Sequence, residues 1–122
     1  MKLRFRQNSL RLRVNRREVE NLSTGLPLKE YVDFPGKSRF AYTLESVPSD
    51  VPLAEFREGT LRIVIPAANV RDWASTDAIG MYFELAASGS LLKLAIEKDL
   101  ECVDGPLDER DPDAFPRSVK SC

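Results

Sequence analysis

The sequence contains no histidine and only two cysteines in 122 residues. Without histidine, neither a Ser-His-Asp nor a Cys-His catalytic relay can be built, and a zinc site with histidine ligands is impossible. These absences exclude most of the familiar hydrolase and metalloenzyme classes. We therefore expect no metal ion, no cofactor and no catalytic residues.

Long apolar runs are also missing, so the sequence predicts no membrane-spanning segment. The basic stretch 1–6 lacks the apolar centre of a signal peptide, which favours a cytoplasmic protein. In that compartment Cys102 and Cys122 are more often free thiols than a disulfide, although a bridge between them is geometrically possible.

Composition is that of a globular chain, with 43% hydrophobic and 30% charged residues, and the length suits one domain. The net charge of −1 hides an asymmetry. Residues 1–45 carry a net charge of +5, whereas residues 46–97 and 98–122 each carry −3. Such an imbalance bears on binding partners rather than on the fold.

Apolar and basic residues alternate over residues 1–6 and 10–14, which predicts a β-hairpin that turns at Gln7-Asn8. Asn15 followed by Glu18 is typical of a helix N-terminus, and Gly25 suits the helix end. Strands are predicted over 28–34 and 39–45. The first 45 residues therefore form a ββαββ unit.

Residues 46–51 are interpreted as a linker, after which the pattern restarts over residues 52–97. Strands are expected at 53–57 and 60–65, a helix with Pro66 in its first turn, and strands at 79–85 and 91–97. A shift of 51 positions aligns the elements of the two halves. It matches Phe5 with Phe56, Arg6 with Arg57, Leu10 with Leu61, Arg11 with Arg62, Val19 with Val70, and Tyr31 with Tyr82. We predict an internal duplication.

Residues 98–122 differ in character, because the acidic cluster at 108–113 has no periodicity. A loop or partly disordered tail is predicted there. Phe115-Pro116 could anchor this tail to the body of the protein.

The stretch from Gly59 to Ala67, followed by a short helix and Asp77-Ala-Ile-Gly80, resembles the AbrB/MazE swapped-hairpin domain, with Ile65-Pro66 as the most specific part. In that family a ββαββ protomer dimerises by interlocking its hairpins, and the dimer binds DNA. The resemblance covers residues 52–97 and, more weakly, 1–45. It implies a mainly β fold with two short helices, a swapped-hairpin barrel formed as a pseudo-dimer by a single chain, and hence a monomer in solution.

The whole chain also resembles a family of small uncharacterised bacterial proteins. The resemblance lies in the start, Met1 to Arg13, and in the segments Glu97 to Cys102 and Asp113 to Pro116. It implies a common fold and no assigned activity.

The first hypothesis for function is a nucleic-acid-binding or transcription-regulatory module that uses the basic face of the N-terminal hairpin. A two-stranded ribbon fits the major groove of DNA, and arginine suits phosphates and guanine edges. The AbrB-like domains use the same region. The candidate residues are Lys2, Arg4, Arg6, Arg11, Arg13, Arg16 and Arg17.

Three alternatives remain open. The arginines could form a solvated sheet face, paired with cross-strand acids or with the acidic tail. The protein could instead be an antitoxin-like or structural interaction module that binds a partner protein through residues 98–122. Catalysis is the weakest hypothesis, because Glu97 and Asp99 form a pair of carboxylates without a recognisable nucleophile or base.

Overall fold

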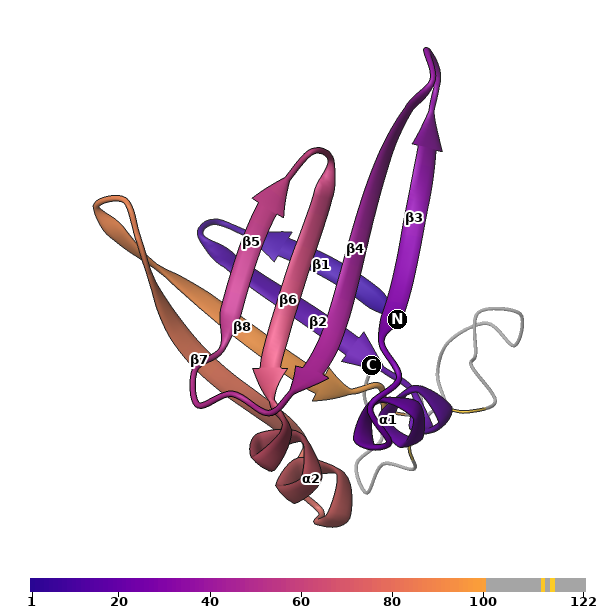
Figure 1. Cartoon of the computed structure of the whole chain (residues 1–122), viewed down its shortest axis with the longest axis vertical. Helices are drawn as coiled ribbons and strands as arrows, with labels where there is room; N and C mark the ends of the chain where they lie inside the picture. The colour runs from indigo at the N-terminus through magenta and orange to yellow at the C-terminus, as the bar shows by residue number, and fades with distance from the viewer. Residues whose placement is uncertain (101–112, 114, 116–122) are drawn as a thin grey trace.

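The computed structural model describes residues 1–100, 113 and 115. Within these residues, eight strands form two four-stranded sheets, and two short helices lie at one end of them (Figure 1). Sheet A has the order β1 (Lys2–Arg6), β2 (Ser9–Val14), β8 (Ser90–Lys98) and β7 (Gly80–Ala87). Sheet B has the order β3 (Leu28–Phe34), β4 (Ser38–Val47), β6 (Thr60–Pro66) and β5 (Leu53–Arg57). The helices are α1 (Arg16–Ser23) and α2 (Ala67–Ser75).

The two halves of the chain exchange hairpins. Each half has the element order ββαββ, as predicted, but its two hairpins lie in different sheets. In sheet A, β2 of the first half pairs in parallel with β8 of the second half, and in sheet B, β4 pairs in parallel with β6. Neither sheet can therefore form from one half alone.

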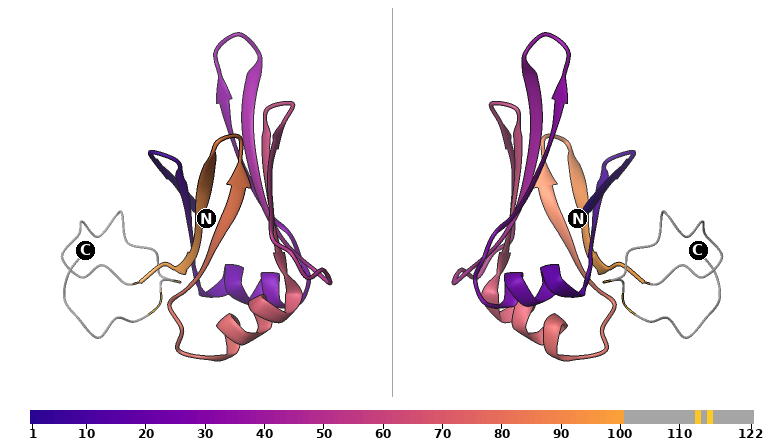
Figure 2. Two further views of the ribbon diagram at one scale, coloured as in Figure 1. Left: turned by 90° about the vertical axis from the view of Figure 1, so that its left-hand side faces the viewer. Right: turned by 90° about the vertical axis from the view of Figure 1, so that its right-hand side faces the viewer.

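The predicted barrel is not present, because the described strands form two separate layers. Strands within a sheet lie about 4.8 Å apart, whereas sheets that pack through their side chains lie about 10 Å apart. The buried side chains of the core lie between sheets A and B, and the strand pairing in the described residues joins no strand of one sheet to a strand of the other. The strands of sheet A run obliquely across those of sheet B in Figure 1, and the helices close one end of the sandwich in Figure 2.

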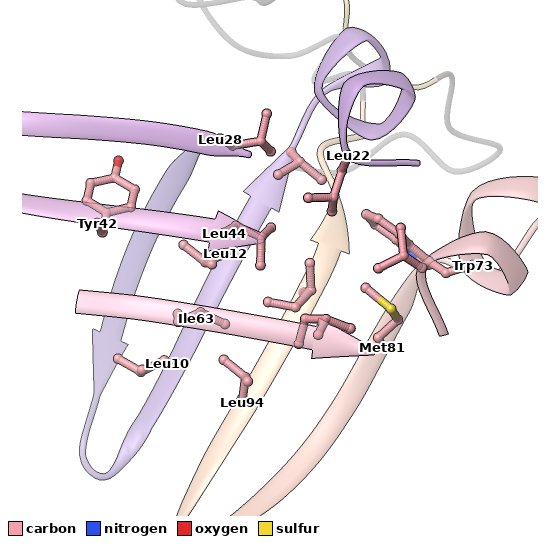
Figure 3. Packing of buried hydrophobic residues seen from close by; sticks show 14 of the residues in the cluster. Leu10, Leu12, Leu22, Leu28, Tyr42, Leu44, Ile63, Trp73, Met81 and Leu94 are labelled. Atoms are coloured by element: carbon pink, nitrogen blue, oxygen red, sulfur yellow. The ribbon is translucent and has the colours of Figure 1, made fainter. Parts of the chain in front are cut away.

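The core lies between the sheets and under the helices (Figure 3). The alternation predicted from the sequence decides which side chains enter it, since every second residue of a strand faces inward. Sheet A contributes Leu10, Leu12, Val14, Met81, Leu94 and Ile96, and sheet B contributes Leu28, Tyr42, Leu44, Leu61, Ile63 and Ile65. Burial of such a side chain contributes about 1.5–3 kcal/mol to folding.

Helices α1 and α2 pack against each other and use equivalent residues for the core. Val19 and Leu22 of α1 and Val70 and Trp73 of α2 are all buried, which confirms the predicted spacing. The N-terminus of α1 has the predicted capping box: the Glu18 amide donates to Asn15 Oδ1 (2.9 Å), and the Asn15 amide donates to Glu18 Oε1 (2.9 Å).

Several local predictions need correction. Pro66 ends β6 and caps α2, rather than lying in the first turn of that helix, because its extended ψ of 134° continues the strand. Strand β4 continues to Val47, into the predicted linker, because it pairs with β6 as far as Pro66. Asparagine is the residue of the turn Gln7-Asn8 expected to take the left-handed backbone, but Gln7 takes it (φ 51°), and the Asn8 side chain donates to the Leu91 carbonyl oxygen (2.7 Å).

The predicted equivalence of Tyr31 and Tyr82 is wrong. The first three elements of each half begin 51 residues apart, but β3 and β7 begin 52 residues apart. Residues that pair across neighbouring strands form a row of the sheet. The row of Tyr31 contains Ala41 and Thr60. The row of Tyr82 contains Ala95 and Arg11. The two tyrosines therefore occupy different rows of their sheets.

The C-terminal segment returns to the body, as the sequence suggested for Phe115. Phe115 packs at the edge of the core and forms a parallel bridge with Leu100, and its amide donates to the Asp99 carbonyl oxygen (2.8 Å). Lys98 and Asp99, predicted to begin the tail, are buried at the end of β8. Cys102, Cys122 and all of the acidic cluster except Asp113 lie outside the described residues.

Candidate functional site on the outer face of sheet A

The face of sheet A that points away from the core carries most of the predicted binding residues. Strand pairing arranges its side chains in rows across the four strands. One row runs Arg4, Arg11, Ala95 and Tyr82, and the next runs Arg6, Ser9, Lys93 and Glu84. The third runs Lys2, Arg13, Glu97 and Gly80. We call this surface the A face.

The A face is hollow at its centre. Ser9 and Ala95 are short, and they lie between long side chains on the outer strands β1 and β7. The resulting hollow has a volume of about 560 Å³ and is bordered by Arg4, Arg6, Arg11, Lys93, Tyr82 and Glu84. This volume is within the range of about 300–1,000 Å³ found for ligand sites.

Glu97 contacts Tyr82, Arg11 and Arg13 at one end of the hollow. Its carboxylate accepts a hydrogen bond from the Tyr82 hydroxyl (2.8 Å) and lies 3.2 Å from Arg11 Nε and 3.8 Å from Arg13 Nε. Burial and the hydrogen bond to the negatively charged Glu97 raise the pKa of Tyr82. Tyr82 therefore stays neutral and acts as a hydrogen-bond donor at physiological pH.

Two arginines at the rim are not neutralised within the part of the chain that the structure describes. Lys2 forms an ion pair with Asp99 (2.8 Å), and Glu97 forms ion pairs with Arg11 and Arg13. Arg4 and Arg6 pair with no described acid, and both side chains are exposed. The A face has a net positive charge, because its three acids, Glu84, Glu97 and Asp99, are outnumbered by six cations. These are Lys2, Arg4, Arg6, Arg11, Arg13 and Lys93.

Because Gly80 has no side chain, it leaves the space that the Tyr82 ring occupies. A Cβ atom at Gly80 would lie 2.6 Å from the Tyr82 hydroxyl oxygen and 2.8 Å from Cζ of the ring. The ring therefore lies back over the glycine, toward Glu97. Tyr82 nevertheless remains 61% exposed, and it borders a second, smaller hollow of about 240 Å³ beside α2.

Five of the seven candidate residues lie together on the A face, and two do not. Arg16 and Arg17 lie on α1 next to the C-terminal segment. The Arg16 guanidinium lies 5.8 Å from the centre of the Phe115 ring, and Arg17 Nε lies 4.0 Å from Asp113. These two arginines contact the protein's own C-terminal segment.

The sequence interpretation missed Tyr82, Lys93 and Glu84. Their outward positions follow from the alternation in 80–98, but their proximity to Arg4 and Arg11 depends on the parallel pairing of β2 with β8. Glu97 was considered only as part of a carboxylate pair with Asp99. In the structure each of these acids is in an ion pair with cations from the first hairpin.

The corresponding face of sheet B is largely neutralised. Arg62 Nε lies 2.6 Å from Glu45, and Arg39 Nε lies 2.6 Å from Asp33. The hydrogen bonds to these carboxylates raise the pKa of both arginines. Glu55 stands on β5 where β1 has Arg4. The difference between the halves that the sequence indicated is therefore a difference between the two outer faces.

Some features are absent from the residues that the structure describes. No group of three or more Cys, Asp or Glu side chains within 1–100, 113 and 115 is arranged to hold a metal ion. None of the helices in this part of the chain is long and apolar enough to cross a membrane.

Comparison with known proteins gives a family but no characterised relative. No curated protein and no solved structure matches the chain significantly. A family model described as a family of unknown function, DUF7009, matches residues 1–119, which is nearly the whole chain. The protein therefore belongs to the DUF7009 family.

Proposed function

We propose that this protein binds nucleic acid through the A face. The observation that carries the proposal is the pair of exposed arginines, Arg4 and Arg6, which have no described acidic partner and lie beside a hollow that Arg11 and Lys93 also border. Cations that have no acidic partner among the described residues are available to phosphates, and their binding releases counterions from the nucleic acid. A transcription-regulatory role is consistent with this chemistry.

The hairpin exchange supports the same proposal. The AbrB/MazE resemblance predicts that the two hairpins of each ββαββ unit separate and interlock with those of the other unit, and β2–β8 and β4–β6 pair across the halves in this way. We interpret the chain as a single-chain counterpart of a swapped-hairpin dimer. Among the residues that the structure describes, it differs from such a dimer in having two open sheets and one basic outer face.

The test is a salt titration with labelled oligonucleotides, single-stranded and duplex. If three to five phosphates are contacted, log K should fall with log salt with a slope between about −2 and −4.5. The absence of detectable binding to either oligonucleotide at about 50 mM salt would refute the proposal.

A pair of double variants locates the binding surface. Arg4→Glu with Arg6→Glu reverses the charge of the rim, and we expect affinity to fall at least about tenfold. Lys29→Glu with Arg57→Glu is the matched control, because it makes the same charge change on the outer face of sheet B. An equal loss in both variants would show that only net charge matters and would contradict a site on the A face.

The alternative is a protein-interaction module that binds a partner through residues 98–122. Because Phe115 and Asp113 contact Leu100, Arg16 and Arg17, part of this segment is attached to the body. A chain ending at Leu100 keeps β8 intact and tests this function. It should remain folded and lose any specific protein partner, whereas the nucleic-acid hypothesis expects its binding to oligonucleotides to persist.

A further inference from the structure

We infer that the A face selects single-stranded over duplex nucleic acid, and that Tyr82 is the surface on which an unpaired base stacks. This inference rests on the proposed function and adds the substrate class. It is carried by the position of one exposed aromatic ring, by the shape of the hollow beside it and by the cations on the opposite rim.

Tyr82 is held in place and yet accessible. Gly80 leaves room for the ring above the strand, and the hydrogen bond to Glu97 (2.8 Å) fixes its tip. Glu97 is itself fixed by Arg11 and Arg13. A ring that is already ordered but 61% exposed loses little conformational entropy when a base stacks on it.

The hollow favours an unpaired base over a duplex. Its floor is formed by Ser9 and Ala95 at the middle of a four-stranded sheet, so a ligand must enter between the side chains of β1 and β7. A flat group on a flexible backbone can do this. The bases of a duplex are stacked and paired inside a rigid helix and cannot stack on the Tyr82 ring that borders the hollow.

The cations of the A face lie where the sugar-phosphate backbone of a single-stranded nucleic acid would pass. Arg4 and Tyr82 stand on the same row, three strand spacings apart, which corresponds to about 14 Å between their Cα atoms. Arg4 and Arg6 on one side and Lys93 near the middle can contact phosphates while a base lies against Tyr82. A positively charged groove with an aromatic stacking surface is the usual combination in proteins that bind single strands.

The experiment compares variants of Tyr82 in binding to oligothymidylate of about 20 nucleotides, longer than the ~4–16 nucleotide sites of single-strand-binding folds, and to a duplex of equal length. Wild-type protein should bind the single strand more tightly. Tyr82→Leu should weaken single-strand binding about 5- to 150-fold and change duplex binding little. Tyr82→Phe keeps the ring and should stay within about threefold of wild type.

Two further variants separate stacking from general damage. Tyr31→Leu removes a tyrosine of similar exposure (55%) from the outer face of sheet B and should have no effect. Gly80→Ala displaces the Tyr82 ring without removing it, and it should weaken single-strand binding in the wild-type background but not in Tyr82→Leu.

The outcomes distinguish the two proposals. Equal or tighter binding of the duplex, or unchanged single-strand binding by Tyr82→Leu and Gly80→Ala, would overturn this inference while leaving nucleic-acid binding intact. Failure of wild-type protein to bind either oligonucleotide would overturn both.

Discussion

Two tyrosine hydroxyls in this protein donate to carboxylates, one on the outer face of sheet A and one on the inner face of sheet B. Tyr82 on the A face donates to Glu97, and Tyr42 on the inner face of β4 donates to Glu30 (2.9 Å) and to the Met1 carbonyl oxygen (3.1 Å). The first pair orders a surface that a ligand can reach. The second pair joins the buried Tyr42 to the half-buried Glu30 and affects stability, because Tyr42 also holds the start of the chain against sheet B.

Tyr42 should make stability fall at alkaline pH. Burial, the hydrogen bond to Glu30 and the charge of Glu30 all raise the pKa of Tyr42. The unfolded tyrosine ionises first, at a pKa of about 10, so the stabilisation is complete below that pH and is lost as the pH rises toward the folded pKa. One such group contributes at most about 1.4 kcal/mol per pH unit to this loss.

The measurement is denaturant unfolding of wild type and Tyr42→Phe between about pH 9 and 11. We expect the variant to lose less free energy of unfolding over this interval than the wild type. Tyr31→Phe, which removes an exposed hydroxyl, is the control. Equal pH slopes for wild type and Tyr42→Phe would contradict the assignment.

At the scale of the elements, the parallel pairs β2–β8 and β4–β6 hold the halves together. Each unites a strand from the first half with one from the second, and each brings buried side chains into line, such as Leu12 beside Ile96 and Leu44 beside Ile63. A half without its partner would expose these side chains along an unpaired strand edge.

This arrangement predicts complementation between separated halves. Residues 1–50 and 51–122, produced as two chains, should be unfolded or self-associated when alone and should form a folded one-to-one complex when mixed. Circular dichroism and sedimentation of each half and of the mixture test this. A half that is a stably folded monomer would contradict the exchange of hairpins.

For the molecule as a whole, one chain already supplies both sheets and the shared core, so we predict a monomer. Sedimentation equilibrium should give a mass near 13.7 kDa. Phe5 (60%) and Phe56 (66%) are among the exposed large apolar side chains, which can drive association. A dimer that is abolished by Phe5→Ser with Phe56→Ser would overturn the prediction and would identify these residues as its interface.

Local features of the sequence were sufficient for most of the elements. The alternation around Leu10 and Leu12, the capping pair Asn15 and Glu18, and the spacing of Val70 and Trp73 each depend on neighbours within a few residues. Strand and helix propensities, caps and turns act over that range, so the sequence could predict them. The boundaries at Val47 and Pro66 were misplaced because strand pairing with a distant partner extends them.

The sequence by itself determined two ββαββ units, a basic first hairpin and the absence of histidine chemistry. Only the tertiary structure decided which hairpins share a sheet. That pairing places Tyr82, Lys93 and Glu97 on the same sheet face as Arg4 and Arg11, although the two groups are more than seventy residues apart in the chain. The physical reason is that hydrogen bonds between strands can be made by any extended backbone, so the choice of partner depends on how the whole core packs.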